Sequence, residues 1–254
     1  WEGIKNNNAT TFGGVPYIYE MLEKLRFERI NLPSLKYITQ AGGKLGRKLS
    51  TEFAEICMDK GIDFYVMYGQ TEATSRMSYL PCELAHTKAG SIGIAIPGGK
   101  FWLEDANRNV IKKNDTTGEL VYQGDNVSMG YAGSYLDLMN SDENKGILHT
   151  GDIAKRDGDG FYYITGRMKR FLKMYGNRVN LDEIEELLRS AGLDCVCAGT
   201  DDNMKIYITK PYNKDRIMNY VTKSTGINRN GFSFVYMDKI PRNDSGKVLY
   251  SKLG

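Results

Sequence analysis

Two side chains with complementary chemistry stand side by side in the segment YGQTEAT, residues 68–74. The hydroxyl of Thr71 can donate a hydrogen bond to a phosphate oxygen, and the carboxylate of Glu72 can bind Mg²⁺, which prefers oxygen ligands. The same residues are also typical of a glycine-containing turn in which Thr71 is the N-cap of a helix. The segment therefore predicts either a contact with a metal-bound phosphate or a structural turn.

Three further groups of polar residues follow along the chain. Asp152 comes after a glycine turn in the segment HTGD, and its carboxylate could accept two hydrogen bonds from a ribose, although ordinary turns use aspartate too. Five cations lie between residues 167 and 178, where they form either a solvated face or the surroundings of a phosphate-bearing ligand. Lys247 follows a turn with proline and glycine, where a surface lysine is the ordinary interpretation.

The elements expected around the first motif are those of a parallel α/β sheet. Residues 35–43 are an apolar run that ends in glycines, residues 48–61 have a helical pattern closed by a glycine, and residues 63–69 are another apolar run. Strand, helix and strand at this spacing make a βαβ unit, whose ligands bind at the carboxyl ends of the strands. Those ends carry Ala41 to Gly43 and Tyr68 to Glu72.

The rest of the chain predicts a β-rich part and then a compact α+β module. Between about residues 90 and 166, short runs of Val, Ile and Tyr alternate with glycines, which is typical of an antiparallel or barrel-like subdomain. A helix capped by Asn180 and closed by Gly192 opens the module. The expected fold class is α/β and α+β, with a partial doubly wound α/β subdomain, a β-barrel-like subdomain and a small mobile C-terminal α+β domain. The remaining elements expected in the module are strands near 194–199, 205–210 and 232–237 and a helix near 214–224.

Composition limits the function classes. The 254 residues carry 34 Lys and Arg against 31 Asp and Glu, a net charge of +3, so no strong attraction to nucleic acid is expected. A mean hydropathy of −0.45 without a long apolar run predicts no integral membrane segment. The four cysteines are too few and too scattered for a disulfide framework, so we expect them to be reduced thiols. The N-terminal residues do not have the pattern of a secretory signal, which favours a cytoplasmic location.

Six motifs, taken in order, resemble the core motifs of the adenylate-forming superfamily, which includes acyl-CoA synthetases, peptide-synthetase adenylation domains and luciferases. The resemblance extends from Thr11 to Leu253 and implies a carboxylic acid activator that uses ATP, Mg²⁺ and coenzyme A. The acid attacks the α-phosphate of Mg·ATP, pyrophosphate leaves, and the thiol commonly captures the acyl-adenylate. Cations and Mg²⁺ are needed because two anions must meet. The motifs are AGGKL, YGQTEAT, GELVYQGDNVSMGY, HTGD, GRMKRFLKMYGNRVNLDEIE and PRNDSGK.

The resemblance also implies a role for each matching residue. Residues 1–167 would be the C-terminal part of the large AMP-binding domain, α/β to about residue 80 and β-rich from about 81, and residues 168–254 the lid domain. Loss of the adenylation lysine is expected to slow acyl-adenylate formation roughly 10²-fold or more. In the large domain the implied contacts are Gly42, Gly43, Tyr68 and Gly69 for adenine, Thr71 for phosphate, Glu72 for Mg²⁺, and Asp152 and Arg167 for ribose. In the lid they are Lys169 as the hinge, Lys173 and Gly176 for the thiol donor, and Lys247 as the adenylation lysine.

Departures from the family pattern leave alternatives open. The family's phosphate loop, rich in Ser, Thr and Gly, would lie upstream of Trp1 and has no counterpart here, so we expect a fragment of a ligase that is inactive by itself. Gln70 and Lys169 favour acyl- or aryl-CoA ligases, because amino-acid-activating domains resemble YGPTE and place Asp at the hinge. The alternatives are an acyl carrier protein as acceptor, or a non-catalytic nucleotide-binding or interaction module. The sequence implies a small carboxylic acid substrate and does not distinguish short-chain, fatty and aromatic acids.

Overall fold

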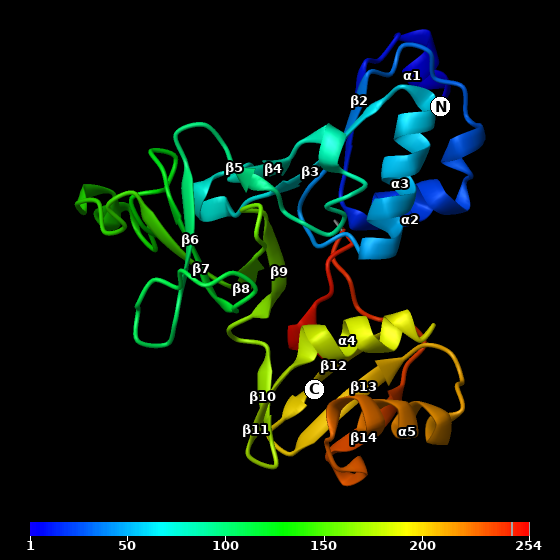
Figure 1. Ribbon diagram of the computed structural model, residues 1–254, viewed down its shortest axis with the longest axis vertical. Helices are drawn as coiled ribbons and strands as arrows, with labels where there is room; N and C mark the ends of the chain where they lie inside the picture. Colours follow the sequence, from blue (N-terminus) through cyan, green and yellow to red (C-terminus); the bar gives the residue numbers. More distant parts are fainter. Residues whose placement is uncertain (245, 254) are drawn as a thin grey trace. The chain divides into compact units, whose positions relative to one another are not determined.

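The structure, a computed structural model, describes residues 1–244 and 246–253, which form two compact units (Figure 1). The first unit is Trp1–Ile164, and the second begins at Thr165. Among the described residues, no helix has the length and apolar character needed to cross a bilayer. The residues that the structure describes also include short 3₁₀ helices: η1 (Phe27–Arg29), η2 (Thr71–Ala73), η3 (Cys82–Leu84), η4 (Tyr135–Met139), η5 (Arg229–Gly231) and η6 (Tyr250–Lys252).

A mixed five-stranded sheet opens the first unit, with the strands in the order β1-β2-β3-β4-β5. The first three strands are parallel and the last two antiparallel. Helix α3 (Arg47–Lys60) joins β2 to β3 and ends at Gly61, which has the left-handed φ of 65° expected of a glycine cap. The predicted βαβ unit is therefore confirmed. The strands are β1 (Thr11–Gly14), β2 (Tyr37–Gln40), β3 (Asp63–Tyr68), β4 (Ser78–Leu80) and β5 (Ile94–Ala95).

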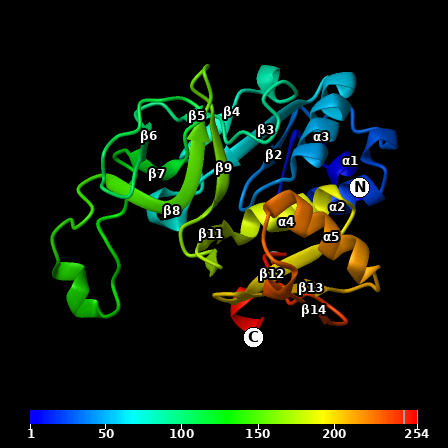
Figure 2. The ribbon, with the colours of Figure 1, turned by 60° about the horizontal axis from the view of Figure 1, so that its bottom comes forward.

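The helices of this unit, α1 (Glu2–Asn6), α2 (Pro16–Lys24) and α3, share one apolar cluster on a single face of the sheet. Tyr19 of α2 and Phe53 of α3 meet edge to face, with ring centroids 4.9 Å apart, above Ile38 of β2. On the opposite face, Thr11, Tyr37 and Asp63 are exposed. Within the described chain, the doubly wound arrangement is therefore partial, as the sequence predicts, with helices on one side only (Figure 2).

An antiparallel sheet in the order β6-β7-β8-β9 forms the β-rich part. Its core contains Phe101, Leu120, Tyr122, Leu148 and Tyr162. The predicted β-rich character is confirmed, but within the described residues the sheet is open, because β6 and β9 stand at its two edges and four strands are too few to close a barrel. The loop that carries η4 extends away from these strands in Figures 1 and 2. The strands are β6 (Lys100–Glu104), β7 (Gly118–Gln123), β8 (Ile147–Arg156) and β9 (Tyr162–Arg167).

An ion pair fastens the loop before β5 to the turn between β8 and β9. The ammonium of Lys88 donates to Asp157 at 2.8 Å and also to Asp159, and it lies 5.1 Å from the ring centroid of Phe161. Burial opposes ionisation of Asp157, but hydrogen bonds from Lys88 and from the backbone outweigh burial and hold the pKa of that carboxyl below its ordinary value.

A Lys88→Met variant is expected to unfold at a higher pH than the parent chain on acidification. A carboxyl whose pKa is depressed in the folded state contributes stability above its unfolded pKa, and this contribution is lost as the pH falls through the folded pKa. Without the ammonium, the folded pKa of Asp157 rises. The carboxyl then contributes less to stability, and this contribution is lost at a higher pH. Circular dichroism followed from roughly pH 6 to pH 2 measures the midpoint. Lys113→Met, at an exposed lysine of the same unit, is the control, and equal midpoints for the two variants would contradict this account.

The second unit is an α+β module, as predicted. Strand β12 is antiparallel to β13, and β13 is parallel to β14. Its core contains Leu188, Cys195, Met204, Ile206 and Phe232. The cysteines of the chain are all free, which agrees with the expected thiols. The elements are β10 (Phe171–Met174), β11 (Asn177–Asn180), α4 (Leu181–Ser190), β12 (Cys195–Thr200), β13 (Asn203–Ile208), α5 (Lys214–Thr225) and β14 (Phe232–Tyr236).

Asn180 caps α4 and also fixes the start of the module. Its Oδ1 accepts from the backbone N–H of Asp182 at 2.9 Å, so the predicted N-cap is confirmed. Its Nδ2 donates to the carbonyl of Thr165 at 3.1 Å. A Cβ at Gly166 would lie 1.9 Å from this nitrogen, which explains why glycine stands there. One buried amide therefore joins the segment that enters the module to its first helix.

Candidate nucleotide-binding site

A buried carboxylate joins two of the predicted motifs. Asp152 of β8 is 2% exposed, and its Oδ2 accepts from the Tyr68 hydroxyl at 2.7 Å and from Gln70 Nε2 at 2.9 Å. Tyr68 and Asp152 lie 84 residues apart in sequence, and Tyr68 ends β3. The fold thus brings YGQTEAT and HTGD together. Gln70 also donates to the carbonyl of Thr150 at 3.0 Å. This contact helps to position Gln70, and no pattern in the sequence predicts it.

The turn before Asp152 is fixed by its own hydrogen bonds. The Thr150 hydroxyl donates to the Leu120 carbonyl at 2.7 Å and accepts from the backbone N–H of Asp152 at 3.1 Å. Gly151 has a φ of 68°, and its N–H donates to the carboxylate of Glu119, which is 9% exposed. The direction of the Asp152 side chain is therefore set by both strands, β7 and β8. Sequence reasoning placed Glu119 in a motif without assigning it a role.

The glycine of YGQTEAT is required by packing. A Cβ on Gly69 would lie 2.3 Å from the backbone carbonyl carbon of Ser75, closer than real atoms approach. Thr71 is exposed and is the first residue of η2, whose N-cap is Gln70 without a side-chain capping bond. The alternative in which Thr71 is the cap of a helix is therefore wrong, because the chain turns one residue earlier.

Glu72 lies in the same turn and is partly buried. Its carboxylate accepts a hydrogen bond from the Tyr131 hydroxyl, and its backbone carbonyl accepts from the N–H of Ser128 at 2.7 Å. Among the described residues, no group of three His, Cys, Asp or Glu side chains is arranged to hold a metal. A Mg²⁺ ion at Glu72 would therefore take its other ligands from phosphate oxygens and water, as is common for this ion.

The loop with Gly42 and Gly43 follows β2, the parallel neighbour of β3. Gly42 has a φ of 82°, which favours glycine. The amide of Gln40, 1% exposed, donates to the Gly43 carbonyl at 2.8 Å and holds the loop. Because carboxyl ends of parallel strands share one edge of a sheet, these glycines and Tyr68 stand at the same edge.

Four of the predicted site residues lie close to the start of the second unit. Arg167 ends β9, and its carbonyl accepts from the N–H of Arg170 at 3.0 Å, which closes a turn that contains exposed Lys169. Lys173 is exposed on β10, where its N–H donates to Asp201 at 2.7 Å. Gly176, with a φ of 86°, lies in the two-residue turn between β10 and β11.

Lys247 is exposed in a turn near the C-terminus. Its N–H donates to Asn243 Oδ1 at 2.9 Å, and its carbonyl accepts from the Asn243 N–H at 2.9 Å. Arg242 forms an antiparallel bridge with Val248, which joins the two arms of the turn. Ser245 of the motif PRNDSGK lies outside the described residues. The backbone around Lys247 is therefore fixed while its side chain reaches solvent.

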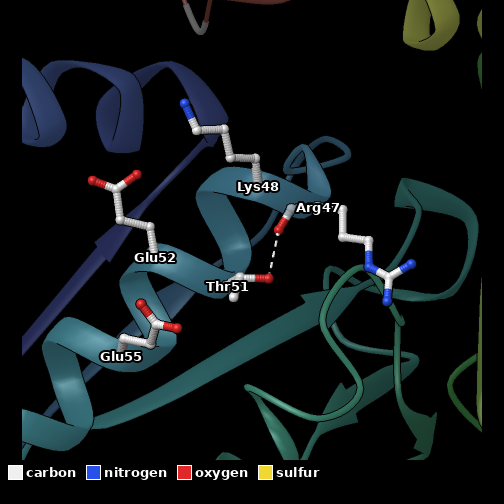
Figure 3. Close-up of a pocket in the computed structure, with 5 residues that line it drawn as sticks. All are labelled: Arg47, Lys48, Thr51, Glu52 and Glu55. Atoms are coloured by element: carbon white, nitrogen blue, oxygen red, sulfur yellow. Dashed lines mark hydrogen bonds between the residues drawn. The ribbon is translucent and has the colours of Figure 1, made fainter. Parts of the chain in front are cut away.

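A surface hollow lies on the exposed face of α3 (Figure 3). The Thr51 hydroxyl donates to the Arg47 carbonyl at 3.0 Å, and Lys48 and Glu52 have the i,i+4 spacing of a solvated helix face. The hollow contains none of the residues predicted to contact the nucleotide, so we do not assign it a ligand. Its lining residues are Arg47, Lys48, Thr51, Glu52 and Glu55.

In the chain, a mixed sheet with a glycine loop and Tyr68 at the carboxyl edge of its parallel strands is followed by a β-rich part that contains the buried carboxylate of Asp152. The chain belongs to the AMP-binding enzyme family, whose model matches residues 1–132, more than half of the chain.

Curated relatives of the chain are 2-succinylbenzoate–CoA ligases. The protein from Bacillus cereus (strain Q1) is 28% identical over 243 residues, which cover 92% of this chain and 49% of that protein. The chain thus spans about half the length of the curated relatives it matches.

Solved structures share the fold. The O-succinylbenzoate coenzyme A synthetase of Bacillus subtilis, in complex with ATP and magnesium ion, has a TM-score of 0.78 at 24% identity, over 99% of this chain and 53% of that one. The amide bond synthetase McbA of Marinactinospora thermotolerans has a TM-score of 0.77 at 18% identity, over 99% of this chain and 53% of that one. These two neighbours carry names of different reactions, so the shared fold is compatible with more than one activity.

Proposed function

We propose that the chain is the C-terminal part of an AMP-forming acid–thiol ligase, which activates a small carboxylic acid with ATP and Mg²⁺ and transfers the acyl group to coenzyme A. The observation that carries the proposal is the buried carboxylate of Asp152, held by Tyr68 and Gln70 at the end of a strand. Family membership and the ligase relatives support it.

Residues of the first unit fit a nucleotide. Two neutral donors orient the Asp152 carboxylate through one of its oxygens, and a carboxylate is a suitable acceptor of hydrogen bonds from ribose hydroxyls. The glycine loop at Gly42 and Gly43 keeps side chains away from the adenine. Thr71 donates to a phosphate, and Glu72 supplies one carboxylate oxygen for Mg²⁺. The metal, when bound, offsets the phosphate charge that would otherwise repel the attacking carboxylate.

Residues of the second unit are proposed to serve both half-reactions. Lys247 stabilises the charge that develops between the acid and the α-phosphate, while Lys173 and Gly176 meet the thiol donor in the second half-reaction. We place the lid domain at residues 168–254 with its hinge at Lys169, four residues beyond the start of the second unit, and Arg167 as a second ribose contact. An exposed turn suits a hinge because few contacts have to break when it moves.

The carboxylic acid substrate and the acyl acceptor can each be tested by name. The names of the relatives make 2-succinylbenzoate the first acid to test. An acyl carrier protein is an alternative acceptor. A non-catalytic nucleotide-binding module is the alternative function.

Calorimetric titration of the chain with AMP, and separately with Mg·ATP, tests the proposal. Binding of AMP without release of pyrophosphate from ATP is expected of the chain alone. Turnover by the chain alone would contradict its incompleteness. Absence of AMP binding would contradict the assignment of the described residues as a sufficient adenosine site.

A Lys247→Ala variant of the longer ligase is expected to lose acyl-adenylate formation. The ammonium stabilises charge mainly in the transition state, so its loss slows pyrophosphate release by roughly 10²-fold or more. Thioester formation from supplied acyl-adenylate should change much less. Lys252→Ala, at another exposed lysine of the same terminal segment, is the matched control. An equal loss in both half-reactions would contradict the assigned role.

A further inference from the structure

Strand β8 contains a bulge at the point where it presents Asp152. The pairing of β7 with β8 is regular up to His149 of β8 and resumes at Ile153. The three residues between them, 150–152, face Leu120 of β7 alone. A bulge bends its strand and redirects side chains, and bulges are common beside functional sites. The direction of the Asp152 side chain therefore depends on the groups that hold this bulge.

Side chains supply hydrogen bonds that hold the bulge. Within it, the Thr150 hydroxyl donates to the Leu120 carbonyl at 2.7 Å and accepts from the N–H of Asp152 at 3.1 Å. From the neighbouring strand, Glu119 Oε1 accepts from the N–H of Gly151 at 3.2 Å. Gly151 is the middle residue of the bulge and directly precedes Asp152. The carboxylate of Glu119 thus holds the bulge at its centre from β7.

The second oxygen of Glu119 belongs to a cluster of charged side chains. Oε2 accepts from Arg108 Nη1 at 3.1 Å, and the same nitrogen lies 3.6 Å from Glu104 Oε2. His149 Nδ1 lies 3.8 Å from one oxygen of each glutamate. Glu104 and Glu119 are directly opposite in the register of β6 and β7, where like charges destabilise a sheet. Such departures from local stability rules are expected at functional sites, which favours a functional use of this pair.

Glu104 and Glu119 form a matched pair of buried carboxylates. They are 8% and 9% exposed, and both lie close to Arg108. The other oxygen of Glu104 accepts from Trp102 Nε1 at 2.7 Å, and among the described hydrogen bonds none joins Glu104 to residues 150–152. The two glutamates therefore differ in the bond to the bulge.

We propose that Glu119 is a positioning residue, whose carboxylate holds the bulge of β8 so that Asp152 is directed at the ribose hydroxyls of the nucleotide. The inference rests on the proposed function. Without this acceptor, the N–H of Gly151 loses a charged partner, and the bulge is held less firmly to β7. Because a hydrogen bond depends steeply on distance and angle, a small displacement of Asp152 weakens its bonds to the ribose.

The test is a calorimetric titration of the whole chain with AMP and with 2′,3′-dideoxy-AMP, which lacks the ribose hydroxyls. Glu119→Met removes the acceptor and is expected to weaken AMP binding about tenfold, as the loss of one hydrogen bond does. Affinity for the dideoxy analogue should stay as in the parent chain, because this ligand has no hydroxyl to donate to Asp152. A purely structural role of Glu119 would instead weaken the binding of both ligands equally.

Three further variants complete the test. Glu119→Asp keeps the charge and withdraws the carboxylate by one methylene group, so it should show the same selective loss, and it replaces Glu119→Met if a thermal melt shows that variant to be unfolded. In a chain that already carries Asp152→Asn, Glu119→Met should add little further loss, because the two residues act as one unit. Glu104→Met is the control and should bind AMP like the parent.

The outcomes separate this inference from the proposed function. Folded Glu119 variants that bind AMP like the parent, or that lose AMP and the dideoxy analogue equally, would overturn the role of Glu119 and leave the proposed function standing. The same selective loss in Glu104→Met would overturn that role as well. A parent chain that binds neither AMP nor Mg·ATP, or that binds AMP and the dideoxy analogue equally, would overturn the proposed nucleotide site and, with it, this inference.

Discussion

Replacing Asp152 with asparagine is expected to weaken AMP binding by the chain about 100-fold, while the fold persists. Hydrogen bonds to a charged group contribute about 1.5 to 3 kcal/mol each, so losing the charge at a ribose-binding carboxylate costs about 3 kcal/mol. The buried position of Asp152 strengthens the effect, because water screens the interaction poorly there. Calorimetry measures the affinity, and a thermal melt reports the fold.

Two further variants test whether the charge of Asp152 is responsible for AMP binding. Tyr68→Phe removes one donor to Asp152 and keeps the carboxylate charge, so we expect a smaller loss of affinity, about tenfold. Asp125→Asn changes the charge equally at an exposed aspartate and should bind AMP like the parent. An Asp152→Asn chain that binds AMP normally would show that this carboxylate serves the fold alone.

Replacing Arg170 with methionine is expected to destabilise the second unit by about 3 to 5 kcal/mol at neutral pH. The guanidinium donates to Glu185 at 2.7 Å, to the Cys197 carbonyl at 2.8 Å and to the Tyr250 hydroxyl at 2.7 Å, and it also pairs with Asp182. Glu185 is 6% exposed. Removal of the cation therefore leaves a buried carboxylate without its charged partner, and hydrogen exchange of residues 165–253 measures the loss.

The destabilisation of the Arg170 variant should depend on pH. Burial already raises the pKa of Glu185 above its ordinary value, although Arg170 and the Cys197 N–H favour the ionised form. Without Arg170, the folded pKa rises further, so the folded state binds a proton that the unfolded state releases. Stability then falls as the pH rises from the unfolded pKa of this carboxyl through its raised folded pKa, since the folded state holds more protons in that window.

Two control variants for Arg170→Met change residues of the same unit. Arg216→Met, at an exposed position of α5, should change stability little. The double variant Arg170→Met with Glu185→Gln removes the buried charge and should recover part of the loss, together with its pH dependence. A single variant as stable as the parent at pH 8 would contradict the importance of this pair.

Elements whose signals are local could be predicted from the amino-acid sequence. The strand–helix–strand pattern that ends at Gly61 and the N-cap at Asn180 depend on residues only a few positions apart, so local spacing was sufficient. The motifs for Thr71 and Asp152 were recognised in the same way, and family membership is confirmed.

The cluster of five cations shows where local spacing stops being informative. Four of them, Arg167, Lys169, Lys173 and Arg178, are exposed, as a solvated face predicts. Arg170 is instead held among buried acceptors from α4 and β12. Nothing in a run of basic residues distinguishes the one whose neighbours in space are acidic, because those neighbours come from other elements.

Contacts between groups that lie far apart in the sequence depend on the folded chain. The bond from Tyr68 to Asp152 joins residues 84 apart, and the bond from Tyr131 to Glu72 joins residues 59 apart. The open form of the β-rich sheet likewise depends on which strands pair. Local patterns record the preferences of neighbouring residues, whereas contacts across the chain arise when apolar faces are buried and polar groups must then find partners in the packed fold.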